Sequence, residues 1–250
     1  MTGPTTALAT TIVVPCHDES ARLDPAALVE LAERAAADLV LVDDGSTDGT
    51  GDALRALAAA SDGRIRVLAL PRNVGKGEAV RLGMHDALDG GAALTGYFDA
   101  DVATPPAEMA RLVAIARERP ELAVVMGARV GLLGHRVERS MVRHYLGRVF
   151  ATASSLVLHL DVYDTQCGAK VFRDSPALRA ALARPFTGRW VFDVELLGRL
   201  HRGGIGVDEM LEVPLGAWRD VAGSKLGLPG SAAAGADLVR VARALRRWPD

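Results

Sequence analysis

The sequence predicts an α/β domain built on a mostly parallel sheet, and two observations support this prediction. Short runs rich in Val, Ile and Leu alternate with longer segments rich in Ala and Leu, which is typical of strands buried on both faces and joined by helices. Acidic pairs directly follow two of these runs, at Asp43-Asp44 and at Asp99-Ala100-Asp101. Ligands of open parallel sheets bind at the carboxyl ends of the strands, so both pairs are expected to face one pocket.

The elements can be assigned in order along the chain. Strands are expected at 11–15, 39–43, 65–70, 95–99 and 123–127, with helices between them at 26–37, 50–60, 77–88 and 106–118. Beyond residue 127 the alternation becomes irregular. This second part contains a long segment at 135–160, a run at 168–173, an expected helix at 192–202 and an expected strand at 207–214.

Composition indicates a single globular domain without a membrane span. The 250 residues are 49% hydrophobic and 24% charged, and the formal net charge of -2 provides no global positive field for nucleic acid. The two cysteines, Cys16 and Cys167, are expected to be free thiols in a reducing compartment. The first ten residues lack a basic region, and no apolar run reaches the roughly 18 residues of a spanning helix, so we expect a cytoplasmic protein.

Polar motifs occur at the ends of four expected strands. They are Pro15-Cys16-His17-Asp18-Glu19, Asp43-Asp44-Gly45-Ser46-Thr47-Asp48, Arg72-Asn73-Val74-Gly75-Lys76-Gly77 and Asp99-Ala100-Asp101. This ordered set resembles family 2 glycosyltransferases of the GT-A fold, whose donor site uses a P-x-x-(D/N)-E loop, a D-D-G-S-x-D-x-T loop and a D-x-D metal motif. The resemblance covers about residues 11–225. It implies a GT-A sheet flanked by helices, with an acceptor-side C-terminal portion.

The first two loops are expected to hold the nucleoside of a nucleotide-sugar. A carboxylate only accepts hydrogen bonds, so Asp44, with Asp43 beside it, suits the N–H of a base or the hydroxyls of a ribose. Asp18 and Glu19 would line the same pocket, together with Pro15 of the family motif. The alternative for 43–48 is an Asx-rich turn that caps a helix, and both interpretations can hold together.

Asp99 and Asp101 are the expected metal ligands, because alternate residues of an extended segment point to the same side. The resemblance implies Mg²⁺ or Mn²⁺ held against the donor diphosphate, with Ala100 between the ligands and Asp101 in a catalytic role. The alternative is a strand-end turn with solvated acids. One departure is Ala103, where some relatives place a Gln near the metal.

Gly75-Lys76-Gly77 does not complete a P-loop, because Leu70 and Gly77 stand where that motif requires Gly and Ser or Thr. This excludes a P-loop ATPase. Lys76 at a helix start can still approach the nucleotide, although a solvated loop lysine explains it equally well.

The second half narrows the resemblance to the dolichyl-phosphate glucosyltransferase branch, part of whose pattern is shared by polyprenyl-phosphate mannosyltransferases. The motifs are Asp164-Thr165-Gln166-Cys167-Gly168-Ala169-Lys170, Gly188-Arg189-Trp190-Val191-Phe192-Asp193-Val194-Glu195, and Trp218-Arg219-Asp220 with Gly223-Ser224-Lys225. The resemblance implies UDP-glucose as donor and a polyprenyl phosphate as acceptor. We assign acceptor or phosphate binding to Arg129, Gln166, Arg189, Trp190 and Lys225.

A basic stretch could receive the acceptor phosphate. If 135–160 is helical, Arg136, Arg139 and Arg143 share one face, with Arg148 nearby, and guanidiniums bind phosphate bidentately. A second basic amphipathic helix is expected at 230–250, and both segments are candidates for peripheral contact with the cytoplasmic face of a membrane. The alternative for each is an ordinary helix packed on the domain.

We therefore expect four parts: a flexible stretch at 1–10, a nucleotide-sugar half at 11–128, an acceptor half at 129–229 and the C-terminal helix. The hypothesis is metal-assisted, inverting transfer of glucose to a polyprenyl phosphate, which needs alignment more than a base. A hydroxyl acceptor would need a base, for which Asp193 and Glu195 are the candidates, although a helix N-terminus also favours acids. The alternatives are a glycosyltransferase acting on a small soluble acceptor and a silent nucleotide-sugar-binding or membrane-recruited interaction domain.

Overall fold

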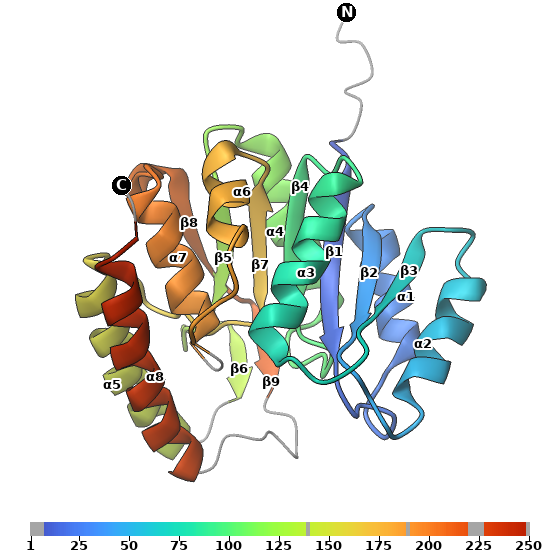
Figure 1. Cartoon of the computed structure of the whole chain (residues 1–250), viewed down its shortest axis with the longest axis horizontal. Helices are drawn as coiled ribbons and strands as arrows, with labels where there is room; N and C mark the ends of the chain where they lie inside the picture. The colour runs from blue at the N-terminus through green and yellow to red at the C-terminus, as the bar shows by residue number, and fades with distance from the viewer. Residues whose placement is uncertain (1–7, 139–140, 189–190, 220–227, 249–250) are drawn as a thin grey trace, which may run out of the picture.

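A seven-stranded sheet organises the chain in the computed structural model, which describes residues 8–138, 141–188, 191–219 and 228–248 (Figure 1). The strand order is β3-β2-β1-β4-β7-β5-β8, and only β7 runs antiparallel to its neighbours β4 and β5. The sheet is therefore mostly parallel, as predicted. Its strands are β1 Thr10–Cys16, β2 Asp38–Asp43, β3 Ile65–Ala69, β4 Leu94–Phe98, β5 Val124–Ala128, β7 Ala169–Arg173 and β8 Met210–Pro214.

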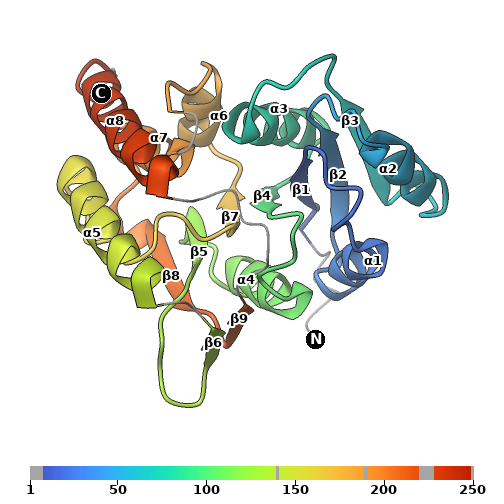
Figure 2. The same cartoon turned by 90° about the horizontal axis from the view of Figure 1, so that it is seen from below.

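Helices cover both faces of this sheet (Figure 2). They are α1 Pro25–Arg34, α2 Thr50–Ala59, α3 Lys76–Asp89, α4 Pro106–Glu118, α5 Met141–Leu158, α6 Pro176–Leu182, α7 Phe192–Arg202 and α8 Leu228–Leu245, with a 3-10 turn at Val207–Glu209. The first two helices begin differently. Asp24 accepts a hydrogen bond from the amide of Ala27 at the start of α1, whereas Gly49, which precedes α2 and has a positive φ, offers no side-chain cap.

Two apolar cores form because each central strand is buried on both sides. Ile12 and Val14 of β1 pack with α1, α2 and α4, while the intervening Val13 packs with α3 and with the helices of the second half. The same alternation continues in β2, where successive side chains point to opposite faces. The predicted runs of Val, Ile and Leu are thus explained by burial on two faces.

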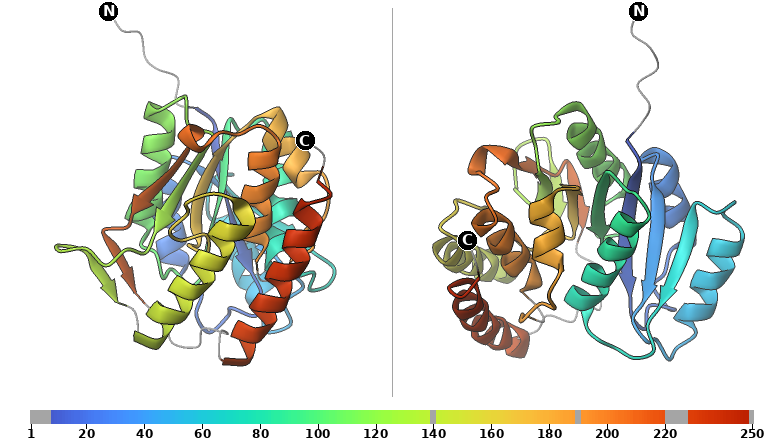
Figure 3. Two further views of the ribbon diagram at one scale, coloured as in Figure 1. Left: turned by 90° about the vertical axis from the view of Figure 1, so that its left-hand side faces the viewer. Right: turned by 45° about the horizontal axis from the view of Figure 1, so that its top comes forward.

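The second half completes this sheet instead of forming a separate domain. β7, from the Asp164–Lys170 motif, lies between β4 and β5 and pairs with both. Outside the main layers, α5 and α8 lie side by side and both pack on α7 (Figure 3). None of the helices in the described ranges combines the length and apolarity needed to cross a bilayer.

One predicted element is wrong. Arg136 does not belong to a helix with Arg139 and Arg143, because residues Arg136–Glu138 form strand β6, which pairs with β9 at Ala217–Arg219. The amide of Arg136 donates to the carbonyl of Gly216, and the helix α5 begins only at Met141. The expected flexible stretch at 1–10 lies mostly outside the described residues, and β1 already includes Thr10.

Candidate active site

The polar loops emerge where the parallel strands β1, β2 and β4 end, so the motifs of the first half meet at one edge of the sheet (Figure 2). The register places Cys16 of β1 opposite Asp43 of β2, and the amide of Asp44 donates to the carbonyl of Cys16. The convergence expected from the sequence is therefore present.

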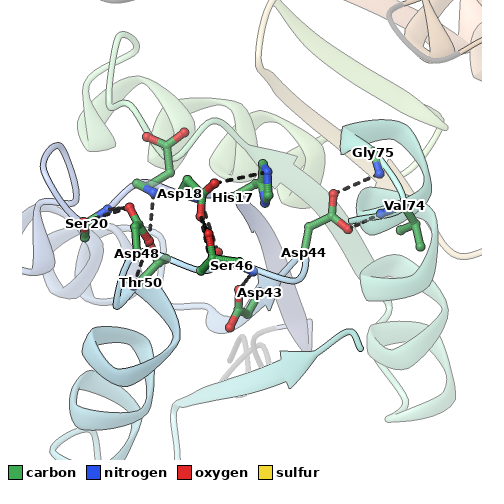
Figure 4. A network of polar contacts seen from close by, with 12 residues as sticks. His17, Asp18, Ser20, Asp43, Asp44, Ser46, Asp48, Thr50, Val74 and Gly75 are labelled. Atoms are coloured by element: carbon green, nitrogen blue, oxygen red, sulfur yellow. Dashed lines mark hydrogen bonds and ion pairs between the residues drawn. The ribbon is translucent and has the colours of Figure 1, made fainter. Parts of the chain in front are cut away.

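Asp44 joins the second loop to the third. Its side chain is buried, and its two oxygens accept hydrogen bonds from the amides of Val74, at 2.7 Å, and Gly75, at 2.9 Å (Figure 4). Gly45 lies so close to the backbone of Arg72 and Asn73 that a β-carbon would collide with it, and its φ of 64° also favours glycine. The contacts of Asp44 therefore set the position of the loop that precedes Lys76.

Asp18, Asp43 and Asp48 hold the first loop against the second. Asp18 accepts from the amide of Thr47 at 2.8 Å, and Asp43 accepts from the amide of Ser46 at 3.0 Å (Figure 4). Asp48 accepts from Ser20 and Thr50. The structure thus shows the turn that we considered as the alternative. Asp18 is exposed at the edge of this network and Pro15 is partly exposed, whereas Glu19 forms an ion pair with Arg22 at 2.7 Å.

Asp99 and Asp101 lie in a turn, which corrects the extended segment expected from the sequence. β4 ends at Phe98, the amide of Val102 donates to the carbonyl of Asp99, and Asp101 accepts from the amide of Ala103 at 3.1 Å. Ala100, between the two acids, is buried in the core. The two carboxylates still influence one another, because burial, followed by the Asp99 charge, raises the pKa of Asp101 above its usual value.

Lys76 supplies the positive charge nearest to these acids. Its Nζ lies 2.6 Å from Oδ1 of Asp99, and helix α3 begins at this residue. Burial lowers the pKa of Lys76, but the charges of Asp99, Asp193 and Asp101 outweigh it, so the pKa lies above its usual value. Lys76, Asp99, Asp101 and Asp193 therefore form one electrostatically coupled site.

The chemistry of this site fits a hard divalent cation bound with help from a ligand. Two neighbouring carboxylates repel one another, and oxygen ligands of this kind suit Mg²⁺ or Mn²⁺. Among the described residues, no three His, Cys, Asp or Glu side chains gather into a complete metal site. A cation held by Asp99 and Asp101 would therefore need further oxygens, which a diphosphate can provide.

Gly168 allows Asp99 to take its position. The amide of Asp99 donates to the carbonyl of Gly168 at 3.0 Å, and a β-carbon at residue 168 would overlap the Asp99 carboxylate. The glycine of the second-half motif thus lies directly against the expected metal ligand.

A buried lysine, for which the sequence analysis predicted no role, binds one of the predicted catalytic acids. Lys170 is fully buried, and its Nζ donates to Oδ1 of Asp193 at 2.8 Å and to the carbonyl of Cys167 at 2.6 Å. The hydroxyl of Tyr97 donates to the same Oδ1. The two lone pairs of this oxygen are therefore both engaged.

Glu195, the other predicted catalytic acid, is 1% exposed and supports the preceding loop. One oxygen pairs with Arg199 at 2.7 Å, and the other accepts from the amides of Thr187 and Gly188. Arg199 in turn stacks on Phe186 and Trp248. These contacts point away from Asp193, as expected for residues two positions apart on a helix.

Arg129 is held in place by the buried Asp164, which the partly buried Glu212 supports. Its guanidinium makes a two-pronged ion pair with Asp164 and lies 5.4 Å from the centre of the Trp218 ring. The Asp164 charge holds the pKa of Arg129 above its usual value despite burial. Glu212 accepts from the amides of Tyr163, at 2.7 Å, and Asp164, at 2.8 Å. Only a three-dimensional structure reveals this support from β8.

The structure describes only some of the remaining residues that were assigned to the acceptor. Gln166 lines a recess with Arg129, and Arg136 is exposed in β6. Arg143 belongs to α5, but its side chain is not among those described. Four further residues lie wholly outside the described ranges: Arg139, Arg189, Trp190 and Lys225. Their predicted roles remain predictions.

The sheet, the loop geometry and the carboxylate pair define a GT-A type domain. A family model described as "Glycosyl transferase family 2" matches residues 11–178. The chain belongs to glycosyl transferase family 2.

Named relatives and solved structures agree with this membership. The chain is 32% identical over 246 residues to a dolichyl-phosphate beta-glucosyltransferase of Trichomonas vaginalis, covering 93% of this chain and 70% of that protein. It is 30% identical over 242 residues to the dolichyl-phosphate beta-glucosyltransferase of Saccharomyces cerevisiae, covering 87% and 69%. The glucosyl-3-phosphoglycerate synthase of Mycobacterium tuberculosis, crystallised with Mn²⁺ and UDP, superposes with a TM-score of 0.69 at 20% identity, covering 97% and 81%.

Proposed function

We propose that the protein transfers glucose from UDP-glucose to the phosphate of a polyprenyl phosphate, with inversion at the anomeric carbon. Relatives at 30% and 32% identity that align over most of the chain are dolichyl-phosphate beta-glucosyltransferases, which supports this donor sugar and acceptor class. The geometry adds an argument of its own about the acceptor.

The observation that carries the proposal is the engagement of both acids that could serve as a base. Oδ1 of Asp193 accepts from Lys170 and Tyr97, and Glu195 is paired with Arg199 and two backbone amides. A hydroxyl nucleophile requires removal of its proton, whereas a phosphate is already an anion near neutral pH. Both candidate bases take part in ion pairs, Asp193 through Oδ1, and this arrangement suits a phosphate acceptor, which needs no base.

Each group of site residues has a separate role in this reaction. An oxygen of the acceptor phosphate attacks the anomeric carbon, and the bond from that carbon to the diphosphate breaks, so that UDP leaves with the bonding electrons. Asp18, Asp43 and Asp44 shape the nucleoside pocket. Mg²⁺ or Mn²⁺ bound by Asp99 and Asp101 would neutralise charge on the leaving diphosphate. Lys76 adds positive charge beside that position.

A transfer assay tests the proposal. The purified chain is supplied with UDP-glucose labelled in the sugar, a short polyprenyl phosphate and either Mg²⁺ or Mn²⁺, and the products are separated by organic extraction and mass spectrometry. We expect the label in a prenyl-phosphate glucose, with less transfer from GDP-mannose. Label found only on a water-soluble acceptor, or no turnover at all with bound UDP-glucose, would contradict the proposal.

Lys76 should compete with the cation for Asp99, because its ammonium lies 2.6 Å from a carboxylate oxygen that the metal needs. Lys76→Met is therefore expected to raise the affinity for Mn²⁺ in the absence of nucleotide by about threefold to tenfold, in line with a partly exposed ion pair. The same change should raise the KM for UDP-glucose. Paramagnetic resonance of unbound Mn²⁺ measures the first effect. Arg34→Met, which removes an exposed charge on α1, is the matched control. Equal Mn²⁺ affinity in the wild type and both variants would refute the competition.

We also propose peripheral contact with the cytoplasmic face of a membrane. On α5, Val149 is 70% exposed and Leu156 is 71% exposed, and they are spaced to lie on one face. The neighbouring α8 exposes Arg240 and Arg243, and the turn that follows it exposes Arg246 and Arg247. Both cysteines are free and buried, in keeping with a reducing compartment.

Sedimentation with anionic vesicles tests this contact. We expect binding that weakens with salt, because basic side chains act through screened charges. A Val149→Glu, Leu156→Glu variant should bind several-fold less, whereas Val207→Glu, at an exposed site beside β8, should bind as the wild type does. Equal sedimentation of all the proteins would argue against this orientation.

A further inference from the structure

A recess lies between α5 and the loop that precedes β7, at the end of the loop nearest to Asp99. Its lining includes Arg148, Phe150 and Ala151 of α5 together with Tyr163 and Thr165 of the loop. The cavity measures about 60 Å³, and a single water needs roughly 10–15 Å³ by this kind of measure. The recess therefore has room for a phosphoryl group.

Thr165 lines this recess and carries an unused hydrogen-bonding group. The residue is 1% exposed, and its hydroxyl is buried without a hydrogen-bond partner among the described residues. Buried polar groups are almost always partnered, so this hydroxyl has a free hydrogen-bonding capacity that a ligand in the recess can use. Thr165 can donate one hydrogen bond to an anion.

Arg148 gives the recess its uncompensated positive charge. Its guanidinium stacks on the Tyr163 ring, 4.2 Å from the ring centre, and no described carboxylate lies within ion-pair distance of it. Arg129, the other cation of the lining, is already bound to Asp164. The net charge of the lining is thus positive, and the unpaired cation is Arg148.

The loop that lines the recess is held by hydrogen bonds, and it leads to Gly168 beside Asp99. Glu212 fixes the amides of Tyr163 and Asp164 from the neighbouring strand. Thr165 lies only three positions before Gly168, which contacts Asp99, so the Cα atoms of Thr165 and Gly168 are within about 11 Å of one another. The recess is therefore on the same loop as the residue that contacts Asp99.

We propose that this recess, the Arg148 recess, binds the phosphoryl group of the acceptor, with Arg148 as its cationic partner and Thr165 as its neutral donor. The proposal rests on the function proposed above and adds the residues that recognise the acceptor. Phe150 and Ala151 offer an apolar wall for the first carbons of the prenyl chain. Arg129 has a different role, because its ion pair with Asp164 holds the loop that lines the recess.

Kinetics with a short, water-soluble prenyl phosphate such as geranyl phosphate keep membrane contacts out of the test. Arg148→Gln is expected to raise the KM for this acceptor about 10- to 100-fold, as loss of a charged hydrogen bond does, and Thr165→Val about fivefold. The kcat and the affinity for UDP with Mn²⁺ should change less than threefold. Arg34→Gln, which removes an exposed charge from α1, should leave all these values unchanged. Wild-type KM values in both recess variants, with normal melting temperatures, would overturn the proposal.

Direct binding separates this proposal from the proposed reaction. Titration calorimetry with geranyl phosphate, inorganic phosphate and geraniol is done on the wild type and Arg148→Gln. We expect both phosphates to bind the wild type, geraniol to bind much more weakly, and the variant to lose phosphate binding. A wild type that binds geranyl phosphate through Arg148 but never glucosylates it would refute the reaction and support the recess. Transfer to geranyl phosphate with binding unaffected by Arg148→Gln would refute the recess alone.

Discussion

Replacing Asp101 with Asn is expected to abolish metal-dependent glucose transfer and to leave the fold intact. The carboxylate lies in the turn after β4 beside Asp99, and an amide oxygen is a much poorer ligand for Mg²⁺ or Mn²⁺. Stabilisation of a leaving group by a cation accounts for several kcal/mol of a barrier, so we expect kcat to fall by about a thousandfold or more.

The fold should survive because the carboxylate is not used to stabilise it. Burial and the neighbouring Asp99 raise the pKa of Asp101, which means that its ionised form is disfavoured in this position. A neutral Asn can keep the hydrogen bond from the Ala103 amide, so the melting temperature should stay equal or rise. Asp52→Asn, on the exposed face of α2, serves as the control for loss of one charge. Undiminished turnover in Asp101→Asn would defeat the assignment of this residue.

The architecture of the first half could be predicted because its signals are local. Strands buried on both faces must be apolar throughout, and β2 illustrates this with a continuous Leu39-Val40-Leu41-Val42 run. Parallel strands also bring their following loops to one edge, so the meeting of the second and third loops through Asp44 follows from the topology. α7 was predicted with its observed boundaries.

The second half contained errors because its elements depend on distant partners. Arg136 was assigned to a helical face by counting residues, but that count holds only within one continuous helix, and pairing with β9 places residue 136 in a strand. Likewise, nothing local marks β7 as the antiparallel strand inserted between β4 and β5.

The buried charges escaped sequence reasoning for the same reason. Lys170 lies within an apolar strand where charge is costly, and its partner Asp193 is 23 residues away. A lysine inside such a run could have signalled a buried ion pair. The identity of the partner required the packing of α7 against β7 and β4, which also brings Tyr97 to the same oxygen.

Replacing Gly168 with Ala is expected to cause a second large loss of activity, by moving Asp99. Every atom nearest to a β-carbon at this position belongs to the Asp99 carboxylate, so the side chain must shift. Displacement of a positioned catalytic group by about 1 Å costs about a hundredfold in rate, and we expect kcat/KM to fall by that factor or more. Overpacking should also lower the free energy of unfolding by about 1–3 kcal/mol.

The measurement combines steady-state kinetics with a Mn²⁺ titration, because a displaced ligand weakens the metal as well as the reaction. Asp99 would also move relative to Lys76, whose ammonium lies 2.6 Å from it, so the variant should lose the effect of Lys76→Met on Mn²⁺ affinity. Gly131→Ala is the matched control, since a β-carbon there meets nothing within 4 Å. Wild-type turnover and Mn²⁺ affinity in Gly168→Ala would mean that the position of the Asp99 carboxylate is unimportant. That result would contradict the role of Asp99 as a metal ligand.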